Sequence, residues 1–295
     1  MASINDLAAA ASALVNPAAA AAAPPQSVPD PGPAAAEAAA PVTRGALIVL
    51  EGLDRSGKTT QVKLLEQRFV ELGRKVKVMR FPDRTTPIGQ MIDSYLKSQV
   101  DMDDHVIHLL FSANRWEAAK IIATLLSQGV TVLCDRYYHS GIVYSAAKQN
   151  PSLTLSWARS PEVGLPRPDL VLFLDLDESQ ARLRGGWGGE AYEKAEMQRR
   201  VRELFWGLSF GKIGTATVLP EAGEVGPKEE VAVGPPSTVH LSGTEYRFRQ
   251  EEEDLHVIDA SPSVEEVAEE IWKVVQERIQ AVERGELGKV VRRVI

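Results

Sequence analysis

The chain alternates short, continuous apolar runs with longer stretches in which apolar residues recur at helical spacing. The apolar runs are short enough to be strands buried on both faces of a sheet, at residues 46–50, 75–79, 130–134, 169–174 and 256–259. The helical spacing covers residues 58–72, 103–128 and 264–282. Strands that alternate with helices predict an α/β fold in which helices flank a five-stranded parallel sheet.

Glycines and serines mark the expected helix ends. Gly73 and Gly129 follow the first two helical stretches, where glycine is a common stop signal. Ser261 and Ser263 are both suitable N-caps for the last helix, because a serine side chain can accept a hydrogen bond from the first turn.

The first part of the chain has a different composition. Residues 1–43 are mainly alanine and proline and lack the large apolar side chains that offset chain entropy. We therefore predict a disordered tail, followed by one domain over residues 44–295. A mitochondrial presequence would need basic residues on an amphipathic helix, but the first lysine or arginine is Arg44. A tail without a catalytic role, or a translation start placed too early, is the simpler interpretation.

A second segment interrupts the α/β pattern. Residues 209–254 combine glycine, proline and charged residues with short β-like pieces, and they end in the acidic run Glu251–Asp254. We interpret this segment as a surface insert. A solvated excursion without function is favoured over an interaction element, because surface loops tolerate insertions.

Composition narrows the expected partners and location. The net charge of −7 offers no electrostatic footprint for duplex nucleic acid or an anionic membrane, so we expect neither as a partner. No run of 18 or more strongly apolar residues occurs, which argues against a membrane span. The single cysteine, Cys134, lies in an apolar run, which favours a core position and a reducing compartment. We expect a cytoplasmic location, with the nucleus as a second candidate.

The strongest motif follows the first predicted strand and opens the first predicted helix. Gly52–Thr59 matches G-x-x-x-x-G-K-[ST], the phosphate-binding P-loop. Gly52 and Gly57 let backbone N–H groups turn inward to cradle phosphate oxygens. Lys58 would reach the β- and γ-phosphates, and the Thr59 hydroxyl is a ligand for Mg²⁺. Arg55, inside the loop, could stabilise charge on the transferred group in the manner of an arginine finger.

Further arginines follow other predicted strands or lie in the long helix. They occur in Arg80–Arg84, at Asn114-Arg115 and in Asp135–Tyr137, where Asp135 is placed to orient Mg²⁺ or its waters. An enzyme that phosphorylates a phosphate must hold two anions close together, and fixed cations at strand ends offset their repulsion. The aromatic candidates for stacking on a base are Phe81, Phe111, Tyr137 and Tyr144.

Several segments together resemble the eukaryotic thymidylate kinase family, whose members are P-loop nucleoside monophosphate kinases. The segments are Val49–Thr60, Arg80–Arg84, Leu109–Glu117, Asp135–Tyr137, Gly164–Leu174 and Val257–Ser261. They span residues 44–208 and 255–285 in the family's order, and leave the tail and the insert outside. The resemblance implies ATP- and Mg²⁺-dependent phosphorylation of dTMP to dTDP in dTTP biosynthesis, with dUMP as a secondary acceptor, by a homodimer.

The same resemblance implies roles for individual residues. The implied acceptor site uses Arg84 and Arg136 for the phosphate, Phe111 and Arg115 for thymine, Asp54 for the sugar 3′-hydroxyl, Tyr144 against a 2′-hydroxyl, and Phe81, Gly141 and Tyr192 for the remaining walls. The implied ATP site comprises Gly52, Asp54, Arg55, Ser56, Gly57, Lys58, Thr59, Thr60 and Arg184. The implied catalytic residues are Arg55, Lys58, Asp135 and Arg136, with Thr59 and Asp135 at the metal. Residues 184–193 resemble the family's short lid, in which Arg184 lies near adenine and Tyr192 over the acceptor.

Three alternative functions fit the sequence less well than a monophosphate kinase. A deoxynucleoside kinase would need a carboxylate to deprotonate a neutral 5′-hydroxyl, whereas Arg84, Arg115 and Arg136 suit an acceptor that carries a phosphate. A GTPase-type switch would need an Asn-Lys-x-Asp segment, which the sequence lacks. A catalytically inactive nucleotide-binding scaffold would have no use for the intact set of P-loop and arginine residues.

Overall fold

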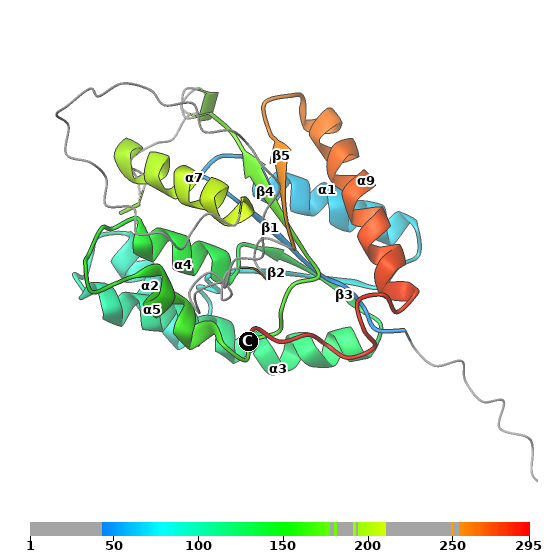
Figure 1. Cartoon of the computed structure of the whole chain (residues 1–295), viewed down its shortest axis with the longest axis horizontal. Helices are drawn as coiled ribbons and strands as arrows, with labels where there is room; N and C mark the ends of the chain where they lie inside the picture. Colours follow the sequence, from blue (N-terminus) through cyan, green and yellow to red (C-terminus); the bar gives the residue numbers. More distant parts are fainter. Residues whose placement is uncertain (1–42, 178–179, 182–190, 193, 211–248, 250–253) are drawn as a thin grey trace, which may run out of the picture. The chain divides into compact units, whose positions relative to one another are not determined.

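A parallel sheet forms the centre of the computed structural model, which describes residues 43–177, 180–181, 191–192, 194–210, 249 and 254–295. Its strands are β1 (Leu47–Gly52), β2 (Val76–Arg80), β3 (Thr131–Asp135), β4 (Leu170–Asp175) and β5 (Leu255–Asp259). The strand order is β2-β3-β1-β4-β5, and every neighbouring pair is parallel (Figure 1). The predicted five-stranded parallel sheet is confirmed, and each predicted strand lies within two residues of an observed one.

Helices cover both faces of this sheet. They are α1 (Lys58–Glu71), α2 (Pro87–Leu96), α3 (Asp104–Ser127), α4 (Tyr138–Ala146), α5 (Leu155–Arg159), the 3₁₀ turn η2 (Ser160–Glu162), α7 (Ala195–Ser209) and α9 (Val264–Glu283). Helices α1 and α9 lie side by side on one face, and α3, α4 and α7 cover the other (Figure 1). Within the described part, no helix combines the length and the apolarity needed to cross a bilayer.

The central strand β1 shows why its sequence is an unbroken apolar run. Ile48 and Leu50 face the core beneath α1 and α9, whereas Leu47 and Val49 face the core beneath α3 and α4. All four side chains are fully buried. Burial on both faces removes the alternation of apolar and polar residues that a half-exposed strand would show. Cys134 of β3 is also buried, as predicted, and burial raises the pKa of its thiol above the usual range.

The last helix begins with a complete capping box. The Ser263 hydroxyl accepts a hydrogen bond from the Glu266 N–H, and the Glu266 carboxylate accepts one from the Ser263 N–H. Each bond satisfies a backbone donor that the first turn would otherwise leave free. Of the two predicted candidates, Ser263 is therefore the N-cap, and Ser261 instead donates to Asp259.

Beyond α9 the chain turns back, and its last residues lie along the segment that follows η2. Gly164 donates its N–H to the carbonyl of Val294 at 2.8 Å, and Val294 donates to the carbonyl of Leu165 at 3.0 Å. Arg159 donates to the carbonyl of Ile295 at 2.9 Å. The Val294 side chain is fully buried. The C-terminal residues thus brace the loop between α5 and β4.

Buried ion pairs close the edge of the sheet where the strands begin. Arg44 donates two hydrogen bonds of 2.8 Å to the Asp169 carboxylate. Asp254, the last residue of the predicted insert, is buried and accepts hydrogen bonds from Arg167 at 2.7 Å and Arg292 at 3.2 Å. Asp254 therefore belongs to the folded body and not to a surface insert. The rest of the predicted insert lies outside the described residues, apart from positions 209, 210 and 249.

Candidate active site

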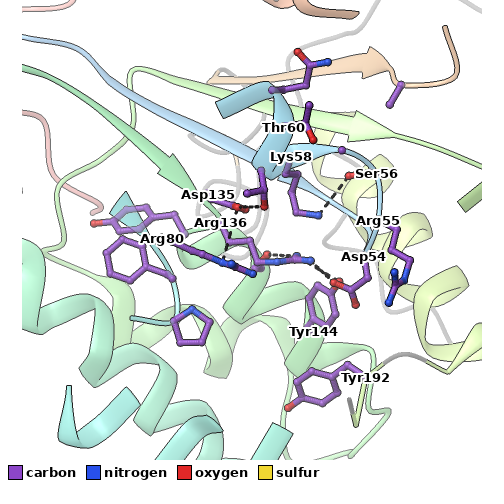
Figure 2. Close-up of a pocket in the computed structure, with 18 of the residues that line it drawn as sticks. Asp54, Arg55, Ser56, Lys58, Thr60, Arg80, Asp135, Arg136, Tyr144 and Tyr192 are labelled. Carbon is purple, nitrogen blue, oxygen red and sulfur yellow. Dashed lines mark hydrogen bonds and ion pairs between the residues drawn. The ribbon is translucent and has the colours of Figure 1, made fainter. Parts of the chain in front are cut away.

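A cavity of about 690 Å³ opens where the strands end, between the loops that follow β1, β2, β3 and β5. Nearly every predicted site residue lines it: Asp54, Arg55, Ser56, Gly57, Lys58, Thr59, Thr60, Phe81, Arg84, Phe111, Arg115, Asp135, Arg136, Gly141, Tyr144 and Tyr192. Of the remaining two, Gly52 ends β1 just behind the wall, and Arg184 lies outside the described residues. Segments far apart in the sequence therefore meet at one site, as Figure 2 shows for several of these side chains together with Arg80.

The P-loop has a backbone that its glycines make possible. Gly52 has a φ of 151°, and an added Cβ would lie 2.6 Å from the Ser56 hydroxyl and 2.7 Å from the Leu174 carbonyl. Gly57 has a φ of 94° at the N-terminus of α1. A side chain at either position would be strained, and at Gly52 it would also collide. The loop therefore brings backbone N–H groups together at a helix N-terminus, which suits an anion.

Lys58 is buried beneath this loop. Its ammonium group donates to the carbonyl of Leu53 at 2.5 Å and lies 3.4 Å from the Ser56 hydroxyl (Figure 2). Burial lowers the pKa of Lys58 to about 7, and the charge of Arg136 adds to this decrease, while Asp54 opposes it. A low pKa means that the protein alone solvates this cation poorly, so an anion bound nearby would favour its charged form.

A hydroxyl and a carboxylate meet beside the loop. The Thr59 hydroxyl donates to Asp135 at 2.7 Å, and Arg80 lies 3.9 Å from the same carboxylate. The described residues contain no group of three or more histidine, cysteine, aspartate or glutamate side chains that could hold a metal by themselves. This donor set fits Mg²⁺, which proteins usually bind through one or two oxygen ligands together with substrate phosphates and waters.

Arg136 is the centre of the polar contacts in the cavity. It has a positive φ of 66° and donates to Asp54 at 2.5 Å, to the Gly52 carbonyl at 3.0 Å and to Ser140 at 3.1 Å. Its guanidinium lies 5.3 Å from the centre of the Tyr144 ring. Burial alone would raise the pKa of Asp54, but Arg136 and Lys58 outweigh it and hold that pKa below its usual value. The guanidinium and the carboxylate are therefore both charged.

The rest of the cavity carries the predicted acceptor residues. Arg84 donates to Asp93 of α2 at 2.7 Å and is about one-third exposed, whereas Arg115 of α3 is buried against Glu162. Tyr192 lies 5.6 Å from Tyr144 and 6.0 Å from Tyr95, measured between ring centres. The predicted acceptor arginines and aromatic residues thus line the same cavity as the P-loop.

A family model for thymidylate kinase matches residues 50–213, which is more than half of the chain. The chain belongs to the thymidylate kinase family. The thymidylate kinase of Danio rerio is 51% identical over 162 residues, which cover 55% of this chain and 76% of that protein. The thymidylate kinases of Schizosaccharomyces pombe and Homo sapiens are 54% and 49% identical over the same length, with the same coverage of each chain. A solved thymidylate kinase structure from Candida albicans has a TM-score of 0.61 and 31% identity, and covers 81% of this chain and 94% of that one.

Two buried residues beside the P-loop and the Arg136 loop were missed in the sequence. Glu51 accepts hydrogen bonds from the Tyr137 N–H at 2.9 Å and from the Ser140 N–H and hydroxyl at 3.1 and 2.5 Å. Burial raises the pKa of Glu51 even though Arg136 lowers it. The available signal was an acidic residue inside an otherwise apolar strand. Through these three hydrogen bonds, Glu51 fixes the loop that carries Arg136.

The other missed residue is Gln198 of α7. Its side chain is fully buried, donates to Asp54 at 2.9 Å and to the Tyr192 carbonyl at 2.8 Å, and accepts from the Asp54 N–H at 3.2 Å. It therefore joins the P-loop to the described end of the predicted lid. No sequence signal distinguishes this glutamine from an ordinary helix residue.

Proposed function

We propose that the protein transfers the γ-phosphoryl group of ATP to dTMP and releases dTDP and ADP. Membership of the thymidylate kinase family supports this activity. The observation that carries it at residue level is that the P-loop and a set of arginines line one cavity. A kinase whose acceptor is itself an anion needs both features, because the two substrates repel each other.

On the donor side, we assign the triphosphate to the P-loop. Its N–H groups and Lys58 would bind the β- and γ-phosphates, and Arg55 would stabilise the charge that develops on the transferred group. Thr59 and Asp135 would hold Mg²⁺, which supplies charge neutralisation across the β- and γ-phosphates. The walls from Ala260 to Val267 leave an apolar space beside Thr60 for the adenine.

On the acceptor side, we assign the dTMP phosphate to Arg84 and Arg136. Both already pair with carboxylates, so a bound phosphate would take over part of the bonding of each guanidinium. Asp54 would then be free to accept the sugar 3′-hydroxyl. Phe111 would stack on thymine, and Tyr144 would exclude a 2′-hydroxyl. The methyl group of thymine distinguishes dTMP from dUMP by only about 1–3 kcal/mol, so we expect dUMP to be a weaker acceptor.

A coupled assay of ADP release tests this function. With Mg²⁺ and ATP, we expect turnover with dTMP, weaker turnover with dUMP, and little with UMP, CMP or thymidine. Arg55→Ala and Lys58→Ala should each lower kcat by at least about 100-fold, the scale on which lost electrostatic stabilisation acts. Turnover with thymidine but not with dTMP would indicate a deoxynucleoside kinase. No turnover with any monophosphate would reject the proposal.

We also propose that the protein acts as a homodimer and binds neither nucleic acid nor membrane. Helix α3 supports the first point, because Val106, Leu109 and Trp116 recur at helical spacing and are each 41–50% exposed. An apolar stripe of this kind on a surface helix is a typical self-association face. The cytoplasmic location remains a prediction.

A further inference from the structure

We propose that Glu162 and Gly141 are positioning residues that fix the guanidinium of Arg115, and that the preference for 4-oxo over 4-amino pyrimidines expected of a thymidylate kinase depends on this fixed position. The inference rests on the proposed function and concerns the same acceptor site. Neither residue needs to touch the substrate. Each would act through Arg115, which lines the cavity together with Phe111.

The carboxylate of Glu162 binds the Arg115 guanidinium through two hydrogen bonds. The Arg115 Nε donates to the Glu162 Oε2 at 2.9 Å, and Nη2 donates to Oε1 in a second, shorter bond. Arg115 is 2% exposed and Glu162 is fully buried. Two parallel bonds between planar groups define the orientation as well as the position of the guanidinium. Among the described residues, Nη1 has no hydrogen-bond partner, so its donors remain available to a molecule in the cavity.

The missing side chain of Gly141 provides the space for this group. An added Cβ would lie 2.6 Å from the Arg115 Nη2 and 3.0 Å from both Nη1 and Cζ. Gly141 lies within α4 and has no positive φ, so the helix itself does not need a glycine here. A glycine weakens a helix relative to alanine, and the close approach of the guanidinium is the physical reason for it at this position.

The carboxylate is itself held in place from outside the cavity. Glu162 ends η2, and the preceding carbonyl, that of Pro161, accepts hydrogen bonds from the Trp116 ring N–H at 2.8 Å and the Ser112 hydroxyl at 3.3 Å. The C-terminal residues brace the following turn through Gly164. Glu162 therefore has a fixed position that does not depend on a bound substrate.

A guanidinium held in this way can only donate hydrogen bonds. Thymine and uracil present a carbonyl oxygen at position 4, which accepts one. Cytosine presents an amino group there, so two donors would face each other where Arg115 meets that position. A site built around a fixed hydrogen-bonding group discriminates strongly against a molecule that leaves the group unpaired.

The experiment compares Glu162→Gln, Glu162→Asp and Gly141→Ala with the wild-type enzyme, using dTMP and dCMP as acceptors. For Glu162→Gln we expect the dTMP KM to rise about 10- to 100-fold, the effect of losing a hydrogen bond to a charged group. The ATP KM should stay close to wild type, and the preference for dTMP over dCMP in kcat/KM should fall by a similar factor. Glu162→Asp keeps the charge and should recover part of both.

Gly141→Ala provides an independent variant, because the added Cβ would displace the guanidinium while Arg115 and Glu162 both keep their charges. It should raise the dTMP KM and reduce the preference over dCMP in the fraction of the protein that is folded, and the melting temperature of the variant is measured alongside. Asp169→Asn is the matched control, because it removes the carboxylate of another buried arginine pair at the opposite edge of the sheet. It should lower stability and leave the preference unchanged.

The inference is overturned if folded Glu162→Gln or Gly141→Ala keeps the wild-type dTMP KM and preference, or if Asp169→Asn shifts the preference equally. If Glu162→Gln does not fold, Gly141→Ala alone decides. A wild-type enzyme that uses dTMP and dCMP equally well would also overturn it, while leaving the kinase activity intact. A wild-type enzyme that uses no monophosphate would instead reject the proposed function.

Discussion

Carboxylates hold two of the cavity's arginines before any nucleotide is bound. Asp54 pairs with Arg136, and Glu162 pairs with Arg115. Orienting these groups in the folded protein reduces the reorganisation needed when a substrate arrives. Removing one partner of the buried Arg115–Glu162 pair would leave an uncompensated buried charge, which costs about 3–5 kcal/mol. Conservative variants are therefore more informative here than alanine substitutions.

His139 of α4 makes the stability of the protein sensitive to acid. Its ring is 1% exposed and stacks on Tyr138 at 4.0 Å, and neither ring nitrogen has a hydrogen-bond partner among the described residues. Burial lowers the pKa of His139 to about 3, and Arg159 and Arg115 add to the decrease. Below the ordinary pKa of 6.5 the unfolded chain binds a proton that the folded protein excludes. The free energy of unfolding therefore falls as the pH decreases, by up to about 1.4 kcal/mol per pH unit.

His139→Phe keeps the stacked ring and removes this proton. We expect near wild-type stability at pH 7, because the larger phenyl ring must be fitted into the site but replaces an unsatisfied polar ring with an apolar one. Between pH 6 and pH 4 the variant should lose less stability than the wild type, measured by urea unfolding at each pH. Carboxylates contribute to both proteins and cancel in the difference. If the free energies of unfolding of the two proteins fall in parallel as the pH decreases, folding does not prevent protonation of His139.

At the level of residues, the sequence predicted those parts of the site whose chemistry is local. The P-loop was recognisable because one short segment contains both its glycines and its lysine. Gln198 was not predictable, because its role comes from a contact with Asp54, which is 144 residues away, and from a bond to the backbone of Tyr192. The pairing of Glu162 with Arg115 was missed for the same reason, since the two residues are 47 positions apart.

At the level of elements, a strand or helix could be predicted where its burial leaves a recognisable pattern of apolar and polar residues in the sequence. The strands were predicted because residues buried on both faces give unbroken apolar runs. Helix α4 was missed, because every residue from Tyr138 to Ser145 is buried and no polar face sets a helical period. Helix α2 was overlooked although Thr86 is its N-cap and Pro87 its first residue, a recognised start signal.

The C-terminal residues act as an element that stabilises the fold although they form no long strand or helix. Val294 is 1% exposed, and Val294→Ala removes the equivalent of two methylene groups, so we expect a loss of about 1.6 kcal/mol in the free energy of unfolding. Val290→Ala is the control, because Val290 is 79% exposed and should change stability by less than about 0.5 kcal/mol. Chemical denaturation measures both. Equal effects would show that the terminal residues do not hold the loop before β4.

At the level of the whole molecule, the parallel topology explains why one cavity gathers so many predicted residues. The loops after β1, β2, β3 and β5 emerge at the same edge of the sheet, so each strand end contributes to a shared site. Sequence order alone predicted that these loops would meet. It did not predict the helices α2 and α4 that complete the acceptor wall, nor the return of the C-terminus to brace the loop between α5 and β4.

The exposed face of α3 provides a prediction about the assembled molecule. If Val106, Leu109 and Trp116 meet the same face of a second copy, the wild type should sediment at about twice the 32.2 kDa mass of one chain. Leu109→Glu places a charge at a position that such an interface would bury, and should shift the protein to the monomer. Val70→Glu is the matched control, since Val70 is 62% exposed on α1, across the sheet from α3. A wild-type monomer would contradict this interface. Equal dissociation by both variants would also contradict it, because a dimer formed through α3 should be disrupted by Leu109→Glu and not by Val70→Glu.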